Sequence, residues 1–364
     1  MKKTFLLIPA LLFSFHGCFD MEGADTTMKT NDFSFKMKNN SFTVVNFTDT
    51  HFETANMLQE NSLLTRTIEN CIETQKPDLI TFSGDNCWGS MVLYRYQQLC
   101  NYMDKFKIPY FFILGNHDRE SCIAPDITAI VEKSEYGHFI EGDVGDDSYG
   151  NYVIQIKNQS DKVIHKLIMI DSRAYYTPKE DEYSYVNIPI DNVIYNNHYD
   201  PATQTTRKIY GDERYDTIRG EQINWYKNQV KSNIESTIIT HMPIVEYTKA
   251  IEQYFNARKN GNETLIEQIH PIGHCVMGES VSCCVRNYDF FKTIKQCGST
   301  KNIICGHDHV NDFSLNYNGI RLTYGVKTGS GCYWDESGET NGCTTLKIDA
   351  TGAASISQYY FKTN

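Results

Sequence analysis

Five short groups of residues with metal-binding side chains each follow directly after an apolar run of strand type. In chain order the groups are Asp49-Thr50-His51, Gly84-Asp85-Asn86, Gly115-Asn116-His117-Asp118, Thr240-His241 and Gly306-His307-Asp308-His309. Their carboxylates, amide oxygen and imidazoles are a mixed set of hard and borderline ligands, which suits two divalent or trivalent metal ions. Two metals about 3.5–4 Å apart can hold the attacking and leaving oxygens of an in-line displacement at phosphorus. Together the groups predict a two-metal hydrolytic site.

The elements that must position these groups are short strands separated by amphipathic helices. Each group is preceded by a predicted strand, and these strands lie at residues 42–47, 79–82, 110–114, 237–239 and 303–305. Helices are predicted at 63–74 (with Ser62 as N-cap), 94–106, 221–230 and 288–296. This alternation is typical of βαβ units on a buried sheet, where ligands collect beyond the carboxyl ends of the strands. Further strands are predicted at 152–156, 165–170, 321–324, 344–348 and 354–360.

The composition is that of an acidic globular protein. The chain has 364 residues, of which 40% are apolar and 22% charged, and its formal net charge is −11. Because binding of nucleic acid relies on Lys and Arg, a nucleic acid is not an expected partner. No internal repeat or linker divides residues 41–364, which are predicted to form one domain. A Tyr-rich stretch without helical period, 174–215, is predicted to be functional or mobile.

The amino terminus has the pattern of a secretory signal. Two lysines precede an apolar run at residues 5–15, after which the sequence becomes polar. This run is shorter than the roughly 20 residues that a membrane span needs. We therefore expect residues 1–20 to be a cleaved signal, with an uncleaved anchor as the alternative, and residues 21–40 to be a flexible lead-in. The mature protein is then expected to have no membrane span and to be secreted or luminal.

A secretory route also predicts disulfides and glycans. Of the twelve cysteines, Cys18 falls within the signal, and the odd number that remains leaves at least one thiol without an internal partner. The pairs suggested by the sequence are Cys332 with Cys343, and Cys275 with Cys283 or Cys284. The alternative for each cysteine is a small buried hydrophobe. Glycans are expected at the sequons of Asn39 and Asn262, which lie in polar stretches.

In order and content the five groups resemble the calcineurin-like metallophosphoesterase family, whose motifs are D-x-H, G-D-x, G-N-H-D/E, a lone H and G-H-x-H. The resemblance runs from about residue 42 to residue 330. Smaller features are similar to the purple acid phosphatase-like branch, namely DTHF at 49–52, PDLI at 77–80, GHDHVND at 306–312 and KTG at 327–329. The resemblance implies an α/β fold of the four-layer α/β/β/α sandwich type.

The resemblance also implies a role for each ligand. The seven ligands are Asp49, His51 and His309 for the first metal, Asn116, His241 and His307 for the second, and Asp85 for both. Iron, zinc and manganese are all compatible with this set. Purple acid phosphatases carry a ligating Tyr three residues after the bridging Asp, where this chain has Trp88. We expect His51 to supply the missing ligand, so that iron(III) bound to a tyrosinate is not expected.

His117 and Asp118 are the catalytic residues that the resemblance implies. Because His117 directly follows a ligand, its side chain is expected to point to the substrate and to act on the leaving oxygen as general acid or stabiliser, with Asp118 holding its ring nitrogen. The activity implied is hydrolysis of phosphate monoesters on a small phosphorylated substrate, by in-line attack of a metal-bound hydroxide. The alternatives are a phosphodiesterase acting on nucleotides or phospholipid headgroups, and a secreted binding protein without catalysis.

Other residues are candidates either for substrate contact or for structure alone. Arg173 and Arg219 are candidates for a phosphate contact through the guanidinium fork, or for structural salt bridges. Five tyrosines either line a substrate cleft or pack on the sheet: Tyr175, Tyr176, Tyr183, Tyr185 and Tyr195. Five histidines fit no motif and are predicted to be structural or exposed: His138, His165, His198, His270 and His274.

Overall fold

The computed structural model describes residues 32–145, 148–175, 195–200, 205–210, 215–232, 234–284, 288–333 and 341–362. The predicted signal at residues 1–20 and the tyrosines at 176, 183 and 185 lie outside these ranges. Within the described ranges, no helix combines the length and the apolar character that crossing a bilayer requires.

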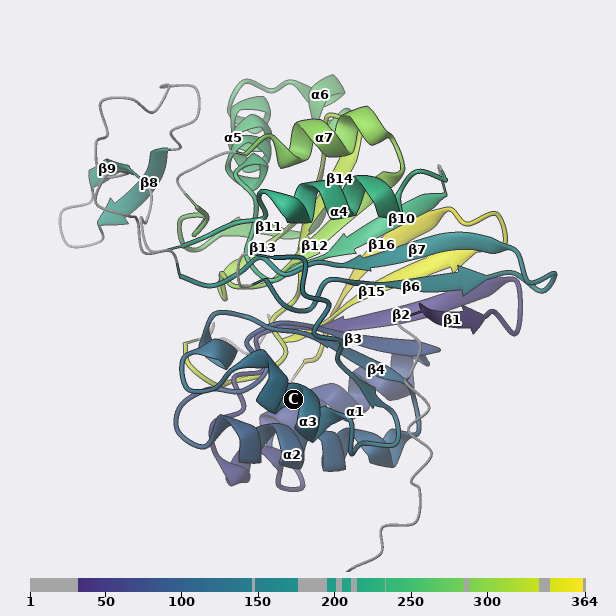
Figure 1. Ribbon diagram of the computed structural model, residues 1–364. Helices are drawn as coiled ribbons and strands as arrows, with labels where there is room; N and C mark the ends of the chain where they lie inside the picture. Colours follow the sequence, from purple (N-terminus) through teal and green to yellow (C-terminus); the bar gives the residue numbers. More distant parts are fainter. Residues whose placement is uncertain are drawn as a thin grey trace, which may run out of the picture. The chain divides into compact units, whose positions relative to one another are not determined.

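Two β-sheets form the centre of the described structure (Figure 1). In spatial order, the described strands of the larger sheet are β1 (Asp32–Lys36), β6 (Tyr152–Lys157), β7 (Val163–Met169), β10 (Glu235–Ile239), β12 (Thr300–Cys305), β14 (Ile320–Tyr324), β13 (Asn311–Tyr317) and β11 (Ile272–Met277). Those of the smaller sheet are β16 (Ala354–Tyr360), β15 (Gly342–Asp349), β2 (Ser41–Phe47), β3 (Leu79–Ser83), β4 (Tyr110–Ile113) and β5 (Gly137–His138). Strands β2, β3 and β4 run parallel, as do β7, β10 and β12. The loops that follow each parallel set therefore lie at one edge of its sheet.

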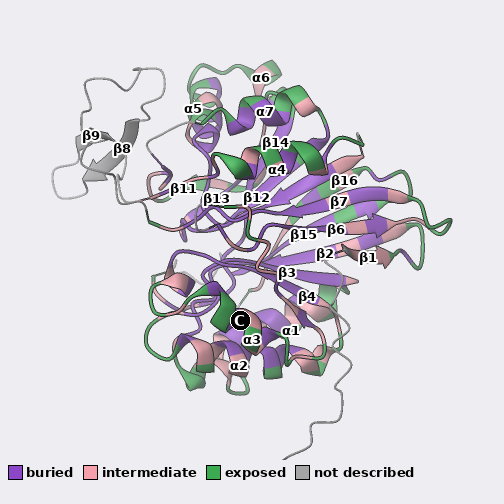
Figure 2. Ribbon diagram, viewed as in Figure 1, coloured by how far each residue is buried: buried purple, intermediate pink, exposed green. Residues whose placement is uncertain are grey.

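Helices cover the outer face of each sheet (Figure 1). Those on the smaller sheet are α1 (Leu63–Gln75), α2 (Val92–Met103) and α3 (Ala124–Val131). Those on the larger sheet are α4 (Glu221–Gln229), α5 (Glu246–Lys259), α6 (Glu263–Ile269) and α7 (Phe290–Cys297). The buried strands lie between exposed outer faces of the helices (Figure 2). This order of layers confirms the predicted four-layer α/β/β/α sandwich.

Three apolar clusters hold the layers together. Phe111 and Leu167 belong to the cluster between the two sheets. Leu99 belongs to the cluster under α1–α3, and Tyr226 to the cluster under α4–α7. Each buried side chain of this size contributes roughly 1.5–3 kcal/mol relative to an exposed one. The sheets that carry the strand-end loops are therefore packed on both faces.

Most predicted elements are present with boundaries shifted by up to three residues. Ser62 caps α1 as predicted, since its Oγ accepts the N–H of Thr65 at 3.2 Å. The strands predicted at 152–156 and 165–170 are the antiparallel pair β6 and β7. The α-helices and strands without a counterpart in the prediction are α3, α5, α6, β1, β5, β8 (Tyr195–Asp200), β9 (Thr205–Tyr210), β11 and β13. Helix α5 did carry a signal, because its buried Tyr247, Ile251 and Tyr254 recur at helical spacing. Part of the 174–215 stretch forms a hairpin, made of β8 and β9.

The expectation that residues 21–40 are a flexible lead-in is wrong for the part that the structure describes. Residues 32–36 form β1, which pairs in parallel with β6. The rings of Phe33 and Phe35 meet the ring of Phe111 edge-on, at centroid distances of 4.8 and 5.8 Å. Alternate residues of a strand face the same side, so the Phe-x-Phe spacing places both rings on the core.

The suggested disulfide pairs are not formed. All eleven cysteines that follow the predicted signal are free thiols in this structure. Cys343 of β15 lies not beside Cys332 but beside Cys71 of α1, and a hydrogen bond between these two thiols, together with burial, raises the pKa of Cys71 far above its usual value. Both side chains belong to the apolar cluster under α1–α3. The alternative reading, that these cysteines act as small buried hydrophobes, describes this pair.

His165 is structural, as predicted, and it makes the stability of the fold depend on pH. Its ring is fully buried, with Nδ1 2.8 Å from the carbonyl of Gly352 and Nε2 3.0 Å from the hydroxyl of Thr237. Burial lowers the pKa of His165 from 6.5 to about 4. Between these two values the unfolded chain binds more protons than the folded one. The free energy of unfolding therefore falls as the pH drops through this window, by about 1.4 kcal/mol per pH unit.

We expect His165→Gln to flatten this dependence, because glutamine stays neutral while keeping one donor and one acceptor. Urea unfolding at pH 7 and at pH 5 measures the effect. The natural chain should lose about 2 kcal/mol more than the variant between the two pH values. Equal losses in both proteins would show that His165 does not carry the pH dependence.

Candidate metal centre

The seven residues predicted as ligands come together in one buried cluster. Asp49 and His51 follow β2, Asp85 follows β3, Asn116 follows β4, His241 follows β10, and His307 and His309 follow β12. None of the seven is more than 7% exposed. Strand ends from both sheets thus supply the cluster.

Several of these residues adopt a backbone conformation that is costly outside glycine. The backbone φ is 50° at Asp49, 42° at His51, 49° at Asp85 and 80° at His307. Such left-handed residues cost of the order of 1–3 kcal/mol each and gather at functional sites. Two neighbouring glycines make room for the carboxylates, since a Cβ at Gly115 would overlap Asp85 and a Cβ at Gly306 would overlap Asp49. The fold tolerates this strain in order to aim the side chains inward.

The first group of donor atoms consists of Asp49, His51, Asp85 and His309, whose ligand atoms all lie within 4.8 Å of one another. The Nε2 atoms of His51 and His309 are 2.9 Å apart. His309 Nε2 lies 3.5 Å from Asp49 Oδ1, and His51 Nε2 lies 3.5 Å from Asp85 Oδ2. Two imidazole nitrogens and two carboxylates therefore converge on one point.

The second group consists of Asp85, His241 and His307, again within 4.8 Å of one another. His241 Nε2 lies 3.2 Å from Asp85 Oδ2 and 3.2 Å from Asn116 Oδ1, which adds the amide to the group. His307 Nε2 is buried and has no hydrogen-bond partner among the described residues. Asp85 is common to both groups, which is the position of a bridging carboxylate.

Backbone carbonyls fix which ring nitrogen faces the cluster. His241 Nδ1 donates to the carbonyl of Ser83 at 2.9 Å, and His309 Nδ1 donates to the carbonyl of Tyr333 at 2.8 Å. The proton on Nδ1 leaves the Nε2 lone pair for a metal, as is usual for histidine ligands. Lys327, which is buried, donates to the carbonyl of Asp49 at 2.8 Å and so holds the loop after β2.

The electrostatics keep the carboxylates charged. Burial raises the pKa of Asp85, but the charge of His241 and its hydrogen bond outweigh burial and leave the pKa well below its usual range. The same carboxylate raises the pKa of His241 to about 9 against the effect of burial. Burial and the neighbouring His241 lower the pKa of His307 to about 3. A metal would take the place of the proton on His241, so binding of metal is expected to release protons.

These residues fit two metal ions. Four histidine nitrogens, two carboxylates and an amide oxygen form two groups that share one carboxylate. The unpartnered Nε2 of His307 is a buried lone pair, which is costly unless a partner such as a metal satisfies it. No Tyr is placed three residues after Asp85; Trp88 stands there, with its ring 5.9 Å from that of His51.

His117 lies beside the ligands and is more accessible than they are. Its side chain is 25% exposed, and its ring centroid is 5.2 Å from that of His51. Its Nδ1 lies 2.8 Å from Glu120 Oε1, an ion-pair contact whose angle is not that of a hydrogen bond. The backbone N–H of His117 donates to Asp85 Oδ1 at 2.9 Å. His117 therefore lies next to the predicted ligands, with its side chain partly exposed.

Asp118 does not hold the ring of His117, contrary to expectation. Its carboxylate accepts the backbone N–H groups of Asn86, Cys87 and Gly115 at 2.8–3.2 Å. It thereby ties the loop after β3 to the loop after β4. Burial, with the nearby charge of Asp85, raises the pKa of Asp118 to about 6. The carboxylate beside His117 is that of Glu120, which the sequence did not single out.

Three tyrosines border the predicted ligands. Tyr175, one of the five predicted tyrosines, accepts a hydrogen bond from Asn116 Nδ2 at 2.9 Å. Tyr215 meets His307 edge-on at 4.7 Å, and Tyr333 stacks on His309 at 4.2 Å. Of the three, only Tyr175 is among the five tyrosines that the sequence analysis named.

The candidate phosphate contacts, Arg173 and Arg219, both lie against Asp216. Arg219 Nε donates to Asp216 Oδ1 at 2.9 Å, and Arg173 Nη1 lies 3.9 Å from Asp216 Oδ2. Arg173 also donates to Gln222 at 2.8 Å. These contacts correspond to the structural reading of both arginines.

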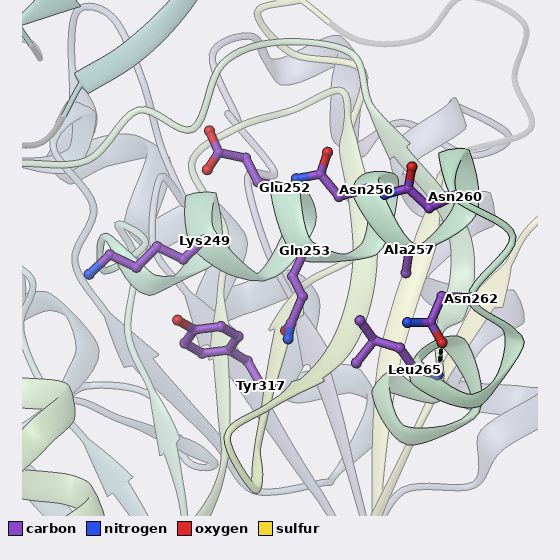
Figure 3. Close-up of a pocket in the computed structure, with 9 residues that line it drawn as sticks. All are labelled: Lys249, Glu252, Gln253, Asn256, Ala257, Asn260, Asn262, Leu265 and Tyr317. Carbon is purple, nitrogen blue, oxygen red and sulfur yellow. Dashed lines mark hydrogen bonds between the residues drawn. The ribbon is translucent and has the colours of Figure 1, made fainter.

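A separate open cavity of about 440 Å³ lies on α5 and α6 (Figure 3). Its lining is mostly polar, with Lys249, Glu252 and several side-chain amides beside Tyr317. None of the lining residues belongs to the ligand cluster. This cavity is therefore separate from the ligand cluster.

Comparison with known proteins gives a family match over the region that contains all seven predicted ligands. Residues 42–311 match the model described as calcineurin-like phosphoesterase. An Arabidopsis thaliana protein named probable inactive purple acid phosphatase 29 is 26% identical over 321 residues, which cover 81% of this chain and 74% of that protein. Phosphatase DCR2 of Saccharomyces cerevisiae is 24% identical over 279 residues, which cover 71% of this chain and 41% of that protein.

Among solved structures, a dimetal phosphatase from Danio rerio aligns with a TM-score of 0.47 and 11% identity, covering 87% of this chain and 99% of that one.

Proposed function

This chain belongs to the calcineurin-like phosphoesterase family, and on that premise we propose that it hydrolyses phosphate monoesters at the cluster of seven ligands. The convergence of two ligand groups on the shared carboxylate of Asp85 carries this proposal. Bound there, two metals would supply a water of lowered pKa and polarise the phosphoryl oxygens. The chain itself holds these donors in place through the loops after β2, β3, β4, β10 and β12.

His117 is proposed as the residue that hands a proton to the leaving oxygen. It has the accessibility that this role needs, because its side chain is 25% exposed while the ligands around it are buried. A positioned general acid contributes about 10²–10⁴-fold to the rate. Glu120 Oε1 lies 2.8 Å from Nδ1 of the ring.

The name of the Arabidopsis relative includes the words probable inactive, which favours one alternative, a binding protein without catalysis. Against that alternative, this chain keeps all seven ligands and His117. A phosphodiesterase is the other alternative, because the same donors can act on a diester.

Secretion and glycosylation are also proposals. They rest on the lysines and the apolar run within residues 1–20 and on the sequons of Asn39 and Asn262. Both asparagines are exposed in the structure, which leaves room for a glycan.

The test uses protein recovered from a secretory host, expected to begin after residue 20. Bound metal is quantified, and rates are compared for p-nitrophenyl phosphate and bis(p-nitrophenyl) phosphate. We expect two metal ions per chain and faster cleavage of the monoester. Faster cleavage of the diester would replace the proposal with a phosphodiesterase. Two bound metals without turnover of either compound would favour the binding protein.

A further inference from the structure

We infer that Tyr175 and Glu120 are positioning residues that orient the side-chain amide of Asn116, so that its oxygen faces the second group of ligands. This inference rests on the proposed role of Asn116 as a ligand. It adds two residues that no motif contains, one on the loop after β7 and one just beyond the loop after β4.

The contacts form a series of hydrogen bonds that leads away from the cluster. Asn116 Oδ1 lies 3.2 Å from His241 Nε2, on the side of the metals. Asn116 Nδ2 donates to the hydroxyl of Tyr175 at 2.9 Å. That hydroxyl in turn donates to Glu120 Oε1 at 3.0 Å.

The outermost hydrogen bond, between Tyr175 and Glu120, determines which groups of the series donate and which accept. An ionised carboxylate can only accept hydrogen bonds, so the hydroxyl of Tyr175 must donate to Glu120. Its oxygen is then left to accept, and the group of Asn116 that faces it must be the NH₂. The carbonyl oxygen of Asn116 is thereby directed at the cluster. In the flipped orientation the amide would present an NH₂, which has no lone pair to offer a metal.

Neighbouring contacts hold Tyr175 in the position that this role needs. Its backbone forms an isolated β-bridge with Tyr215, and the two rings stack at 5.9 Å with an interplanar angle of 22°. Tyr215 meets the ring of His307 edge-on. Tyr175 is still 47% exposed, so burial alone does not fix its side chain. The same oxygen of Glu120 lies 2.8 Å from His117 Nδ1. This contact connects the series of hydrogen bonds to His117, the proposed general acid.

The test measures metal binding and not turnover. Outer-shell partners of metal ligands typically change affinity or activity by about 10–100-fold. Calorimetric titration of the metal-free protein with Zn²⁺ alone should resolve two sites. In Tyr175→Phe we expect one site to keep its affinity and the other to weaken by about 10–100-fold. Tyr359→Phe is the matched control, because it removes a phenol hydroxyl that donates to Asn70 Oδ1 at 2.6 Å outside both ligand groups.

Two variants of Glu120 test the positioning role without changing Tyr175. Glu120→Ala removes the acceptor and should weaken the same single site. Glu120→Gln keeps an oxygen that can accept from Tyr175 and should restore most of the affinity. Thermal melting would reveal whether Tyr175→Phe folds. If it does not, the Glu120 variants alone test the positioning role.

Asn116→Ala separates failure of the inference from failure of the proposed ligand set. If this variant loses one zinc site while Tyr175→Phe and Glu120→Ala keep both at normal affinity, the positioning role is overturned and the ligand set stands. If Asn116→Ala itself binds two zinc ions normally, Asn116 is not a ligand and the premise is overturned.

Discussion

Asp85→Asn is expected to leave the protein with one metal ion per chain or none, and with turnover reduced by at least about 10³-fold. A metal acting as a Lewis acid supplies several kcal/mol of transition-state stabilisation, and each 1.4 kcal/mol is worth tenfold in rate. Asp85 is the only carboxylate present in both ligand groups. Asparagine keeps its shape, but it removes the charge that offsets the repulsion between two cations.

The measurement is metal content per chain, by elemental analysis, beside the rate with p-nitrophenyl phosphate. Asp78→Asn is the matched control. Asp78 accepts the backbone N–H of Thr43 at 2.9 Å outside the cluster, and asparagine can accept it as well. Two metals retained in Asp85→Asn would show that Asp85 does not bridge them.

His117→Ala is expected to lose about 10²–10⁴-fold in turnover, the usual contribution of a general acid, while keeping both metals. The ring of His117 is not a member of either ligand group. Its removal should therefore leave the donor atoms in place. The loss should also depend on the leaving group, because p-nitrophenolate leaves readily without a proton and a simple alkoxide does not.

Rates with p-nitrophenyl phosphate and an alkyl phosphate test this together with metal content. We expect the larger loss with the alkyl phosphate. His270→Ala serves as control, since His270 is an exposed histidine that contacts Arg321 away from the cluster. A variant of His117 that loses its metals along with its activity would identify His117 as part of the ligand set instead.

The ligand cluster could be predicted because each ligand is identified locally. A strand end in a parallel sheet fixes both the place and the neighbours of the residues that follow it, so Asp49, Asp85 and His241 needed no knowledge of the tertiary structure. The residue types then restricted the chemistry. No local sequence pattern indicated the contacts around the cluster.

The carboxylate beside His117 shows why these contacts could not be predicted. Residues His117–Arg119 form a 3₁₀ turn, in which side chains three residues apart lie one above the other. This places Glu120 beside His117 and turns Asp118 towards the loop after β3. The sequence alone suggested the adjacent carboxylate, because it does not reveal the local backbone conformation.

Strand β1 was missed for a different reason. Its five residues gain stability only by pairing with β6 and packing on Phe111, both far along the chain. A segment so short has little local preference, and its conformation is decided by partners that pattern reasoning does not see. The contact between the thiols of Cys71 and Cys343 likewise joins residues far apart in the sequence, so local patterns do not indicate it.

The place of β15 in the smaller sheet has a consequence for biosynthesis. Leu346 of β15 pairs with Val44 of β2, and Thr48 at the end of β2 bridges to Lys327. The ribosome releases β2 long before β15, because about 300 residues separate the two strands. Until then the loop bearing Asp49 lacks the neighbours that fix it, including the buried amine of Lys327. We therefore expect the nascent polypeptide to acquire its cations only after β15 has left the ribosome.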